Sequence, residues 1–244
     1  MELRLTILIK MTAPDRVSHL RALVSETLSK CSDDEREWCD DQCLNRWLTG
    51  IHDMDKCATS LNAALLWRNQ YKPHKIPDEE MAPLNKVGKI YVLPNVVDRQ
   101  GHHVVIIRLC LDSASDGPIE KCIGQYRKNK AVDKVGLIVD LHGVCIGNLD
   151  RQLVMDVLKT MQANYVEQLA YSYMVNAPFV FNTFFKIFNV FIDDATKARI
   201  SVSGTEYKKM LLLKVEESNI PKEYSGTLDY TFDSDKYHEY IKSL

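Results

Sequence analysis

Six of the chain's seven phenylalanines fall within residues 171–200, and this stretch constrains the fold more than any other. Residues 171–175 alternate like a strand, and Asn176-Ala177-Pro178 then interrupts the pattern. Pro178 suits a first helical turn, because its missing N–H would have no partner inside the helix. Over residues 179–192 the apolar side chains return at helical spacing.

The expected helix is apolar over most of its circumference, with a narrow polar stripe at helical spacing. Its broad apolar face carries Phe181, Phe184, Phe185, Phe188, Phe191 and Ile192. At 1.5 Å per residue the helix is about 20 Å long, which is too short to cross a bilayer. It therefore lies in a protein core or packs against another apolar surface, and the pattern alone favours the core.

The bulk properties are those of an ordinary soluble protein. A chain of 244 residues is long enough for one large domain or for a domain with a small helical lobe. The formal net charge of −2 gives no general attraction for nucleic acid or for an anionic membrane. No transmembrane helix is expected, because no run of 18 apolar residues occurs. The odd number of cysteines, seven, without a signal-peptide pattern favours free thiols and a cytoplasmic protein.

Residues 1–85 predict a small all-helical lobe. Apolar residues recur at helical spacing in segments near residues 15–30, 33–50 and 54–68. Gly50 closes the second segment, as glycine commonly does at the end of a helix. Three prolines near residues 71–86 then predict a linker to the rest of the chain.

Residues 86–244 predict an α/β domain. A hairpin is expected first, and the nearly continuous apolar run at residues 135–141 predicts a strand buried on both faces. Helices and strands then alternate, with a short strand at residues 199–202, a helix from about Thr205 and a polar tail. This order implies a mixed, largely parallel sheet that helices cover.

A few residues admit a catalytic or metal-binding interpretation. His142 and Cys145 follow the strand at residues 135–141 and could act as base and nucleophile, but they crowd into one turn and no oxyanion-hole motif is visible. Cys39, Cys43 and His52 could hold zinc, although cysteines four residues apart on a helix more often lie in a core. We therefore expect no catalytic residue, no metal and no cofactor.

Glu167 and Arg199 form a further candidate pair. Glu167 stands just before the strand expected at residues 171–175, and Arg199 opens the next expected strand. The two side chains could therefore meet beside one end of the phenylalanine-rich helix if those strands are neighbours. The alternative is a surface ion pair, which contributes less than about 1 kcal/mol.

Five sets of residues occur in one order along about residues 33–228. They are Leu44, Arg46 and Leu48 with Trp67-Arg68; Asp98–Gly101; Asp140–Gly143; Asn176–Phe179; and Ile220–Gly226. In this order and spacing they resemble the CRAL-TRIO lipid-binding family, with its helical lobe and its Asp-x-x-Gly, Asp-Leu-x-Gly, Asn-x-Pro-x-x-Phe and Leu-Pro-x-x-Tyr-Gly-Gly motifs.

The resemblance implies a lipid pocket between the sheet and the phenylalanine-rich helix, which acts as a mobile gate. Burial of each CH₂ group stabilises the bound lipid by about 0.8 kcal/mol relative to water, so two acyl chains contribute on the order of 25 kcal/mol. Release into water is therefore too costly, and exchange needs a gate that opens at a membrane. The residues expected to line the pocket are Val105, Val135, Leu137, Val139, Tyr173 and Val175.

The resemblance also implies a head-group site. Glu167 and Thr196 match residues that matter for phosphatidylinositol in the family, and Arg199 replaces a lysine. Arginine keeps the charge and offers two parallel donors to a phosphate. The expected partner is therefore a phospholipid, phosphatidylinositol, held by a non-enzymatic cytoplasmic protein that is transiently peripheral to membranes and does not bind nucleic acid.

The chain departs from the family pattern at several positions. Gln168 replaces an arginine, and Ile51-His52 replaces a basic pair of the helical lobe. Residues that hydrogen-bond phosphatidylcholine in the family fall at Val105, Val135, Leu137 and either Leu93 or Pro94, whose side chains form no hydrogen bonds. A second hypothesis is therefore a non-transferring module that binds a sterol-like or retinoid-like ligand and signals to a protein partner.

Overall fold

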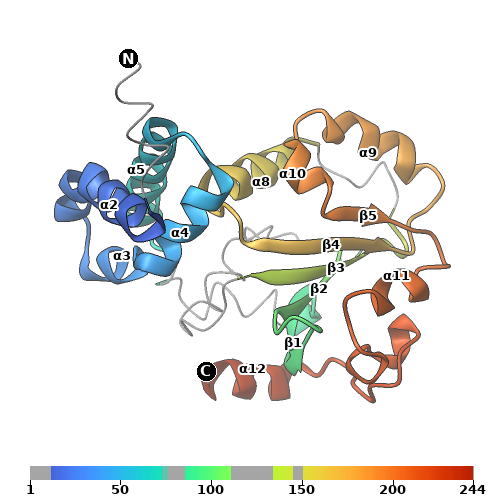
Figure 1. Cartoon of the computed structure of the whole chain (residues 1–244). Helices are drawn as coiled ribbons and strands as arrows, with labels where there is room; N and C mark the ends of the chain where they lie inside the picture. Colours follow the sequence, from blue (N-terminus) through green and yellow to red (C-terminus); the bar gives the residue numbers. More distant parts are fainter. Residues whose placement is uncertain (1–11, 74, 76–85, 111–133, 145–150, 244) are drawn as a thin grey trace. The chain divides into compact units, whose positions relative to one another are not determined.

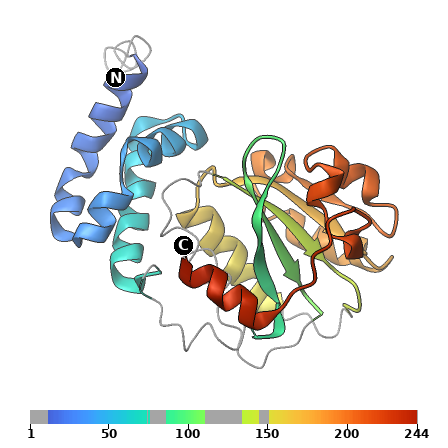
Figure 2. The same ribbon diagram turned by 90° about the horizontal axis from the view of Figure 1, so that it is seen from below.

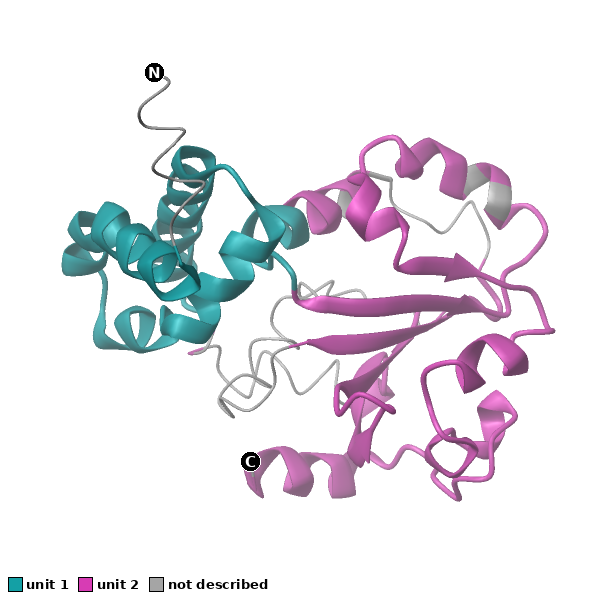
Figure 3. Cartoon of the chain, viewed as in Figure 1, with its two compact units in different colours: residues 1–72, 160–167 teal, residues 73–159, 168–244 magenta. Residues whose placement is uncertain are grey.

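A computed structural model gives the fold of the chain (Figure 1). It describes residues 12–73, 75, 86–110, 134–144 and 151–243. The chain divides into two compact units, the first with residues 1–72 and 160–167 and the second with residues 73–159 and 168–244 (Figure 3). Most of the expected linker, residues 76–85, lies outside the described residues, and so does the domain boundary expected there.

The first unit is helical, as the sequence predicts. Its helices are α2 (Ala13–Lys30), α3 (Asp33–Trp38), α4 (Asp41–Gly50) and α5 (Met54–Tyr71). The segment expected near residues 33–50 divides at Cys39, which leaves the helical conformation. The side chain of Asp40 then accepts a hydrogen bond from the Cys43 amide and starts α4. Thr12 and Asp53 begin α2 and α5 in the same way.

The core of the first unit is built from the apolar stripes of these helices. Among its fully buried side chains are Leu20, Leu44, Trp47, Leu61 and Leu65. Four free cysteines lie in the same core, namely Cys31, Cys39, Cys43 and Cys57. Burial raises the pKa of the Cys57 thiol to about 11. A thiol with so high a pKa is a packing residue at neutral pH rather than a nucleophile.

The second unit is built on a mixed sheet with the strand order β1-β2-β3-β4-β5. The strands are β1 (Ile90–Val97), β2 (His103–Arg108), β3 (Val135–Asp140), β4 (Leu169–Val175) and β5 (Ile200–Val202). The first two strands form the predicted antiparallel hairpin, in which Gly101 adopts a positive φ at the turn. All later pairs are parallel, which confirms the prediction of a mixed, largely parallel sheet.

Helices cover both faces of this sheet (Figure 1). On one face a buried cluster joins Val105, Val139 and Phe181 to the helices α8 (Arg151–Asn164) and α9 (Phe181–Asn189). On the other face a second cluster joins Tyr91 and Ile138 to the C-terminal part of the chain. That part holds α11 (Lys208–Leu212), two 3₁₀ turns, η2 (Glu217–Asn219) and η3 (Lys222–Tyr224), and α12 (Ser234–Ser243).

Two predicted details are wrong. Pro178 does not lie in the first turn of α9, because its carbonyl accepts a hydrogen bond from the Phe181 amide and closes a turn before the helix. The tail, for which the sequence analysis expected no element, forms the helix α12, which lies beside β1 (Figure 2). The hydroxyl of its buried Tyr237 accepts a hydrogen bond from the Val92 amide. Among the described residues, no helix is both long and apolar enough to span a membrane.

Gly136 shows how tightly the sheet is packed. It pairs with Tyr171 of β4, and a Cβ atom at Gly136 would lie 2.2 Å from the Cζ atom of that buried ring. We expect Gly136→Ala to lower the free energy of unfolding by about 1–3 kcal/mol, because the ring has to move inside a filled core. Urea denaturation measures the change. Gly204→Ala is the matched control, since its Cβ would meet nothing nearer than 3.8 Å, and an equal loss in both variants would contradict this packing.

Candidate functional site

The face of the sheet below α9 is apolar. Val105 of β2 pairs in register with Leu137 of β3, and Val139 follows two residues later on the same face. Val105, Val135 and Val139 are buried there, with Leu137 packed against them. Phe181 and Phe188 of α9 belong to the same cluster. The structure thus brings four of the six expected lining residues together with the phenylalanine-rich helix.

Tyr173 and Val175 lie on the opposite face, and in this respect the structure corrects the expected lining. Both belong to the cluster that packs against α11 and the C-terminal part of the chain. Successive side chains of a strand point to opposite faces, so the β4 residues that share the α9 face are Ser172 and Met174. Because β3 and β4 are apolar on both faces, the pattern of residue types did not show which set faces α9.

The helix α9 and its flanking residues carry two apolar surfaces. Phe181 and Phe188 are buried in the cluster on the sheet, with Phe185 packed against it, and Ile192 is also buried. We call the second surface the outer patch, and it consists of Phe179, Val180, Ile187, Val190 and Phe191. Phe179, Val190 and Phe191 are 92%, 74% and 54% exposed. The side chain of Phe184 lies outside the described residues.

The turn before α9 is held by several hydrogen bonds. Asn176 adopts a left-handed φ of 54°, which asparagine tolerates better than most residues. Its amide and that of Ala177 donate to the carbonyls of Gly204 and Ser203, at 3.1 and 3.0 Å. Its side chain donates through Nδ2 to Oδ1 of Asp140 at 2.9 Å. The hinge expected at Asn176-Ala177-Pro178 is therefore anchored to the ends of β3 and β5.

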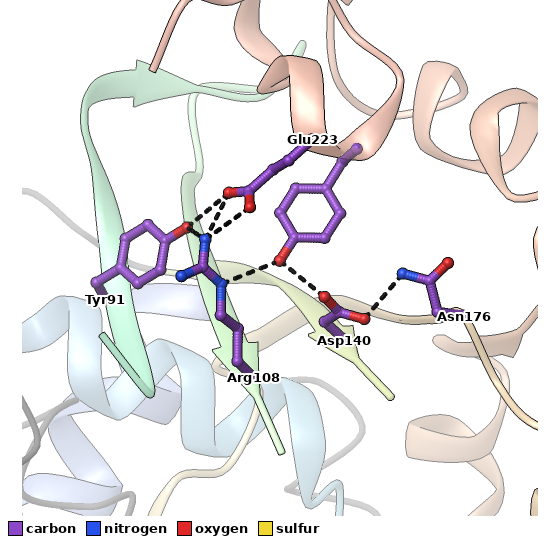
Figure 4. A network of polar contacts seen from close by, with 6 residues as sticks. Tyr91, Arg108, Asp140, Asn176 and Glu223 are labelled. Carbon is purple, nitrogen blue, oxygen red and sulfur yellow. Dashed lines mark hydrogen bonds and ion pairs between the residues drawn. The ribbon is translucent and has the colours of Figure 1, made fainter. Parts of the chain in front are cut away.

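Asp140 also holds the C-terminal part of the chain (Figure 4). The Tyr224 hydroxyl donates to its Oδ2 atom at 3.2 Å and accepts from Nε of Arg108 at 3.4 Å. Nη2 of Arg108 lies 2.6 and 2.8 Å from the two carboxylate oxygens of Glu223 and donates to the Tyr91 hydroxyl at 3.1 Å. We call these five residues with Asn176 the hinge network. Four of its members come from three of the recognised motifs, namely Asp140, Asn176, Glu223 and Tyr224, and the other two belong to β1 and β2.

Burial explains the protonation of the central tyrosine. It raises the pKa of Tyr224 well above its usual range, so the hydroxyl stays protonated and donates to Asp140 at any ordinary pH. The sequence singled out Asp140, Asn176 and Tyr224 as parts of motifs. Glu223 lies in the last motif, but at a position for which the motif specifies no residue type. The sequence did not indicate Arg108, because nothing in a single sequence tells an arginine at the end of a strand from an ordinary surface residue.

The proposed head-group residues Thr196 and Arg199 lie beside the start of β5. Thr196 belongs to the short helix α10 (Asp194–Lys197), and its amide donates to Oδ1 of Asp193 at 2.9 Å. Burial alone would raise the pKa of Asp193, but hydrogen bonds from the Thr196 hydroxyl and from backbone amides outweigh it and lower the pKa. Arg199 donates through Nη1 to the carbonyl of Leu169 at 3.0 Å. β4 and β5 are neighbours, as the argument for Arg199 required.

Glu167 belongs to the first unit and is described with it. Its backbone adopts a left-handed φ of 58°, which is uncommon for a residue other than glycine or asparagine. The other expected sites differ in how far the structure describes them. His142 donates its amide to Asp140 in the turn after β3, and Cys145 lies outside the described residues. Within the described part of the chain no group of three or more potential ligands could hold a metal ion.

Comparison with known proteins decides the family. A family model described as the CRAL/TRIO domain matches residues 86–226, more than half of the chain. The chain belongs to the CRAL/TRIO domain family. This is a family of lipid-binding and lipid-transfer proteins, so the resemblance found in the motifs is confirmed. The match begins just before β1 and ends at Gly226, after the 3₁₀ turn that carries Glu223 and Tyr224.

Curated relatives of this CRAL/TRIO chain match parts of it. A CRAL-TRIO domain-containing protein of Saccharomyces cerevisiae is 33% identical over 103 residues, which are 41% of this chain and 33% of the relative. The SEC14 cytosolic factor of Kluyveromyces lactis is 35% identical over 91 residues, 36% of this chain and 30% of that one. A phosphatidylinositol/phosphatidylcholine transfer protein of Arabidopsis thaliana is 25% identical over 201 residues, 72% of this chain and 37% of that one. The matched part spans about a third of each relative.

A solved structure confirms the CRAL-TRIO fold. The crystal structure of Sfh5 superposes with a TM-score of 0.69 and covers 92% of this chain and 88% of that one. The two sequences are 16% identical, so the similarity concerns the fold alone.

The hinge network predicts a measurable contribution to stability. Asp140→Ala removes the acceptor of the buried Tyr224 hydroxyl and of the Asn176 side chain. We expect the free energy of unfolding to fall by about 1–3 kcal/mol, because buried donors left without an acceptor keep their desolvation penalty. Chemical denaturation measures the loss, and hydrogen exchange at Asn176 and Ala177 should accelerate. Asp229→Ala, at an exposed carboxylate paired with Lys222, is the control and should change stability by less than about 0.5 kcal/mol.

Proposed function

We propose that this protein is a cytosolic lipid carrier that holds one phospholipid, phosphatidylinositol, between the sheet and α9 and exchanges it at a membrane surface. The proposal rests on one observation: α9 and its flanking residues have apolar side chains both on the side buried against the sheet and on the exposed side. Phe181 and Phe188 are buried over an apolar sheet face, while Val190 and Phe191 stay 74% and 54% exposed.

The outer patch is unusual for a helix that only covers a core. Such a helix keeps its apolar residues on the buried side and presents polar ones to water. A cluster of exposed aromatic and aliphatic side chains is typical of a surface that binds another apolar phase, and exposed phenylalanine partitions into the bilayer interface. Lys186 is exposed on the same helix and adds attraction for anionic lipid head groups.

The energetics of acyl chains favour exchange at a membrane. When a lipid leaves the protein for water, each CH₂ group that becomes exposed costs about 0.8 kcal/mol of transfer free energy. Transfer from a bilayer to an apolar protein face nearly cancels this term. A helix that contacts the bilayer on one side and the lipid on the other therefore supports exchange, provided that its hinge holds while it moves. The anchored turn at Asn176 supplies such a hinge.

The head group is assigned by resemblance and by local chemistry. Arg199 would contact the lipid phosphate, with Thr196 near it on α10, and Glu167 would accept hydrogen bonds from inositol hydroxyls. The Arabidopsis relative is named for transferring both phosphatidylinositol and phosphatidylcholine. Here Val105, Val135 and Leu137 occupy the α9 face of the sheet and donate no hydrogen bonds, which favours phosphatidylinositol over phosphatidylcholine.

The outer patch predicts the membrane-binding surface. Val190→Asp with Phe191→Asp should weaken binding to vesicles of phosphatidylcholine and phosphatidylserine by about tenfold or more, because charged side chains resist transfer into the interface. Stability should change little, since both side chains are largely exposed. Leu213→Asp is the control, because Leu213 is 71% exposed at the end of α11, outside the outer patch. Vesicle co-sedimentation gives the measurement, and equal weakening by both changes would contradict the assignment.

The head-group assignment predicts the effect of changing Arg199. Arg199→Ala should lower phosphatidylinositol transfer between vesicles by about tenfold, while Arg199→Lys, which keeps the charge, should lower it less. Thermal denaturation of both variants controls for the lost hydrogen bond to Leu169. Unchanged transfer by Arg199→Ala would contradict the assignment.

Lipid extraction and mass spectrometry of the purified protein test the ligand class directly. A co-purified phospholipid supports the carrier. A co-purified neutral isoprenoid such as a sterol would instead support a non-transferring module that signals to a protein partner.

A further inference from the structure

Gly50 is the last residue of α4, and it lies against the segment that leads to Glu167. A Cβ atom at Gly50 would lie 2.5 Å from Cγ1 of Val166 and 3.1 Å from Cγ of Glu167. Real Cβ atoms essentially never approach another atom as closely as the first of these distances. Only glycine fits here without moving its neighbours.

The backbone conformation at position 50 does not require a glycine. Gly50 does not adopt a left-handed φ, and Ile51, which follows it, is extended and caps α4. The sequence indicated Gly50 as a helix terminator, but its structural role is to let α4 approach the chain at Val166 and Glu167. A glycine that is needed for close approach marks a place where the position of the neighbouring residues matters.

The segment against Gly50 is held firmly within the first unit. Tyr165 is buried, and its ring packs edge-on against Trp67 with centroids 6.1 Å apart. Val166 packs against the core of the helical unit. Glu167 then takes its left-handed φ of 58°, a conformation that persists only where the surrounding structure enforces it. The Oε1 atom of Glu167 would lie 4.0 Å from a Cβ at Gly50, so the carboxylate itself is close to α4.

We propose that Gly50 is a positioning residue for Glu167, and that it thereby supports the preference of this carboxylate for lipids whose head groups carry hydroxyls. The inference rests on the proposed function, because it takes Glu167 as a head-group contact. An ionised carboxylate only accepts hydrogen bonds, so it favours the hydroxyl-bearing inositol over choline, which has no donor. Adding one methyl group at position 50 displaces Val166 and Glu167 and moves this acceptor away from the head group.

A double-mutant cycle tests the proposal. The four proteins are the wild type, Gly50→Ala, Glu167→Gln and the double variant. Each is loaded from vesicles of phosphatidylcholine that contain a minor share of phosphatidylinositol, and mass spectrometry gives the ratio of the two lipids bound. We expect Glu167→Gln and Gly50→Ala each to lower the share of phosphatidylinositol by about tenfold, and the double variant to lower it no further. Thr49→Ala, an exposed change on α4, is the control and should keep the wild-type ratio.

The outcomes distinguish the role of Glu167 as a head-group contact from the role of Gly50 as its positioning residue. If Glu167→Gln keeps the wild-type ratio, the head-group assignment is overturned and the positioning role with it. If Glu167→Gln lowers the ratio but Gly50→Ala does not, or if the two effects simply multiply, only the positioning role is overturned. Should Gly50→Ala fail to fold, Gly50→Ala combined with Val166→Ala takes its place in the cycle, because it removes the approach of 2.5 Å to Val166 and keeps the approach of 3.1 Å to Cγ of Glu167.

Discussion

The carboxylate of Asp140 is the interaction on which the arrangement of the second unit depends. It accepts hydrogen bonds from the Asn176 side chain, from the Tyr224 hydroxyl and from the His142 amide. These donors belong to three segments that are far apart in the sequence, and each donor is placed by its bond to the same residue. A carboxylate suits this role, because its two oxygens accept several hydrogen bonds at once.

This arrangement separates the anchoring of α9 from its packing. The turn before α9 is held by polar contacts to Asp140, Ser203 and Gly204, which have defined directions. The helix itself is held by apolar contacts through Phe181 and Phe188, which have no preferred direction. Under the proposed function a lipid replaces part of the apolar contact when the helix moves, while the polar anchor at Asn176 keeps its geometry.

Much of the fold was predictable because it follows from local periodicity. The helices of the first unit, the hairpin with its turn at Asp98–Gly101 and the buried strand β3 all repeat at the period of their element. The parallel order of the later strands followed from the alternation of helices and strands. The family assignment followed from motifs whose residues, Asp140, Asn176 and Tyr224, proved to be in contact.

What the sequence did not show depends on tertiary structure. The side of the sheet that Tyr173 and Val175 occupy was hidden, because both faces of β4 are apolar. The helix α12 was missed because its segment is mostly polar, and it is stabilised by the contacts of Tyr237 rather than by a long apolar stripe. The role of Gly50 was also hidden, since its neighbours Val166 and Glu167 lie more than a hundred residues away in the chain.

The position of α12 has a consequence for solubility. Among the described strands β1 lies at an edge of the sheet, and edge strands with unpaired amides are templates for pairing with another chain. Here the Val92 amide is bonded to the Tyr237 hydroxyl, and Pro94 has no amide to offer. Asn95, with a φ of 58°, lies where the pairing of β1 with β2 becomes irregular. The C-terminal helix thus helps to protect this edge from aggregation through intermolecular β-sheet pairing.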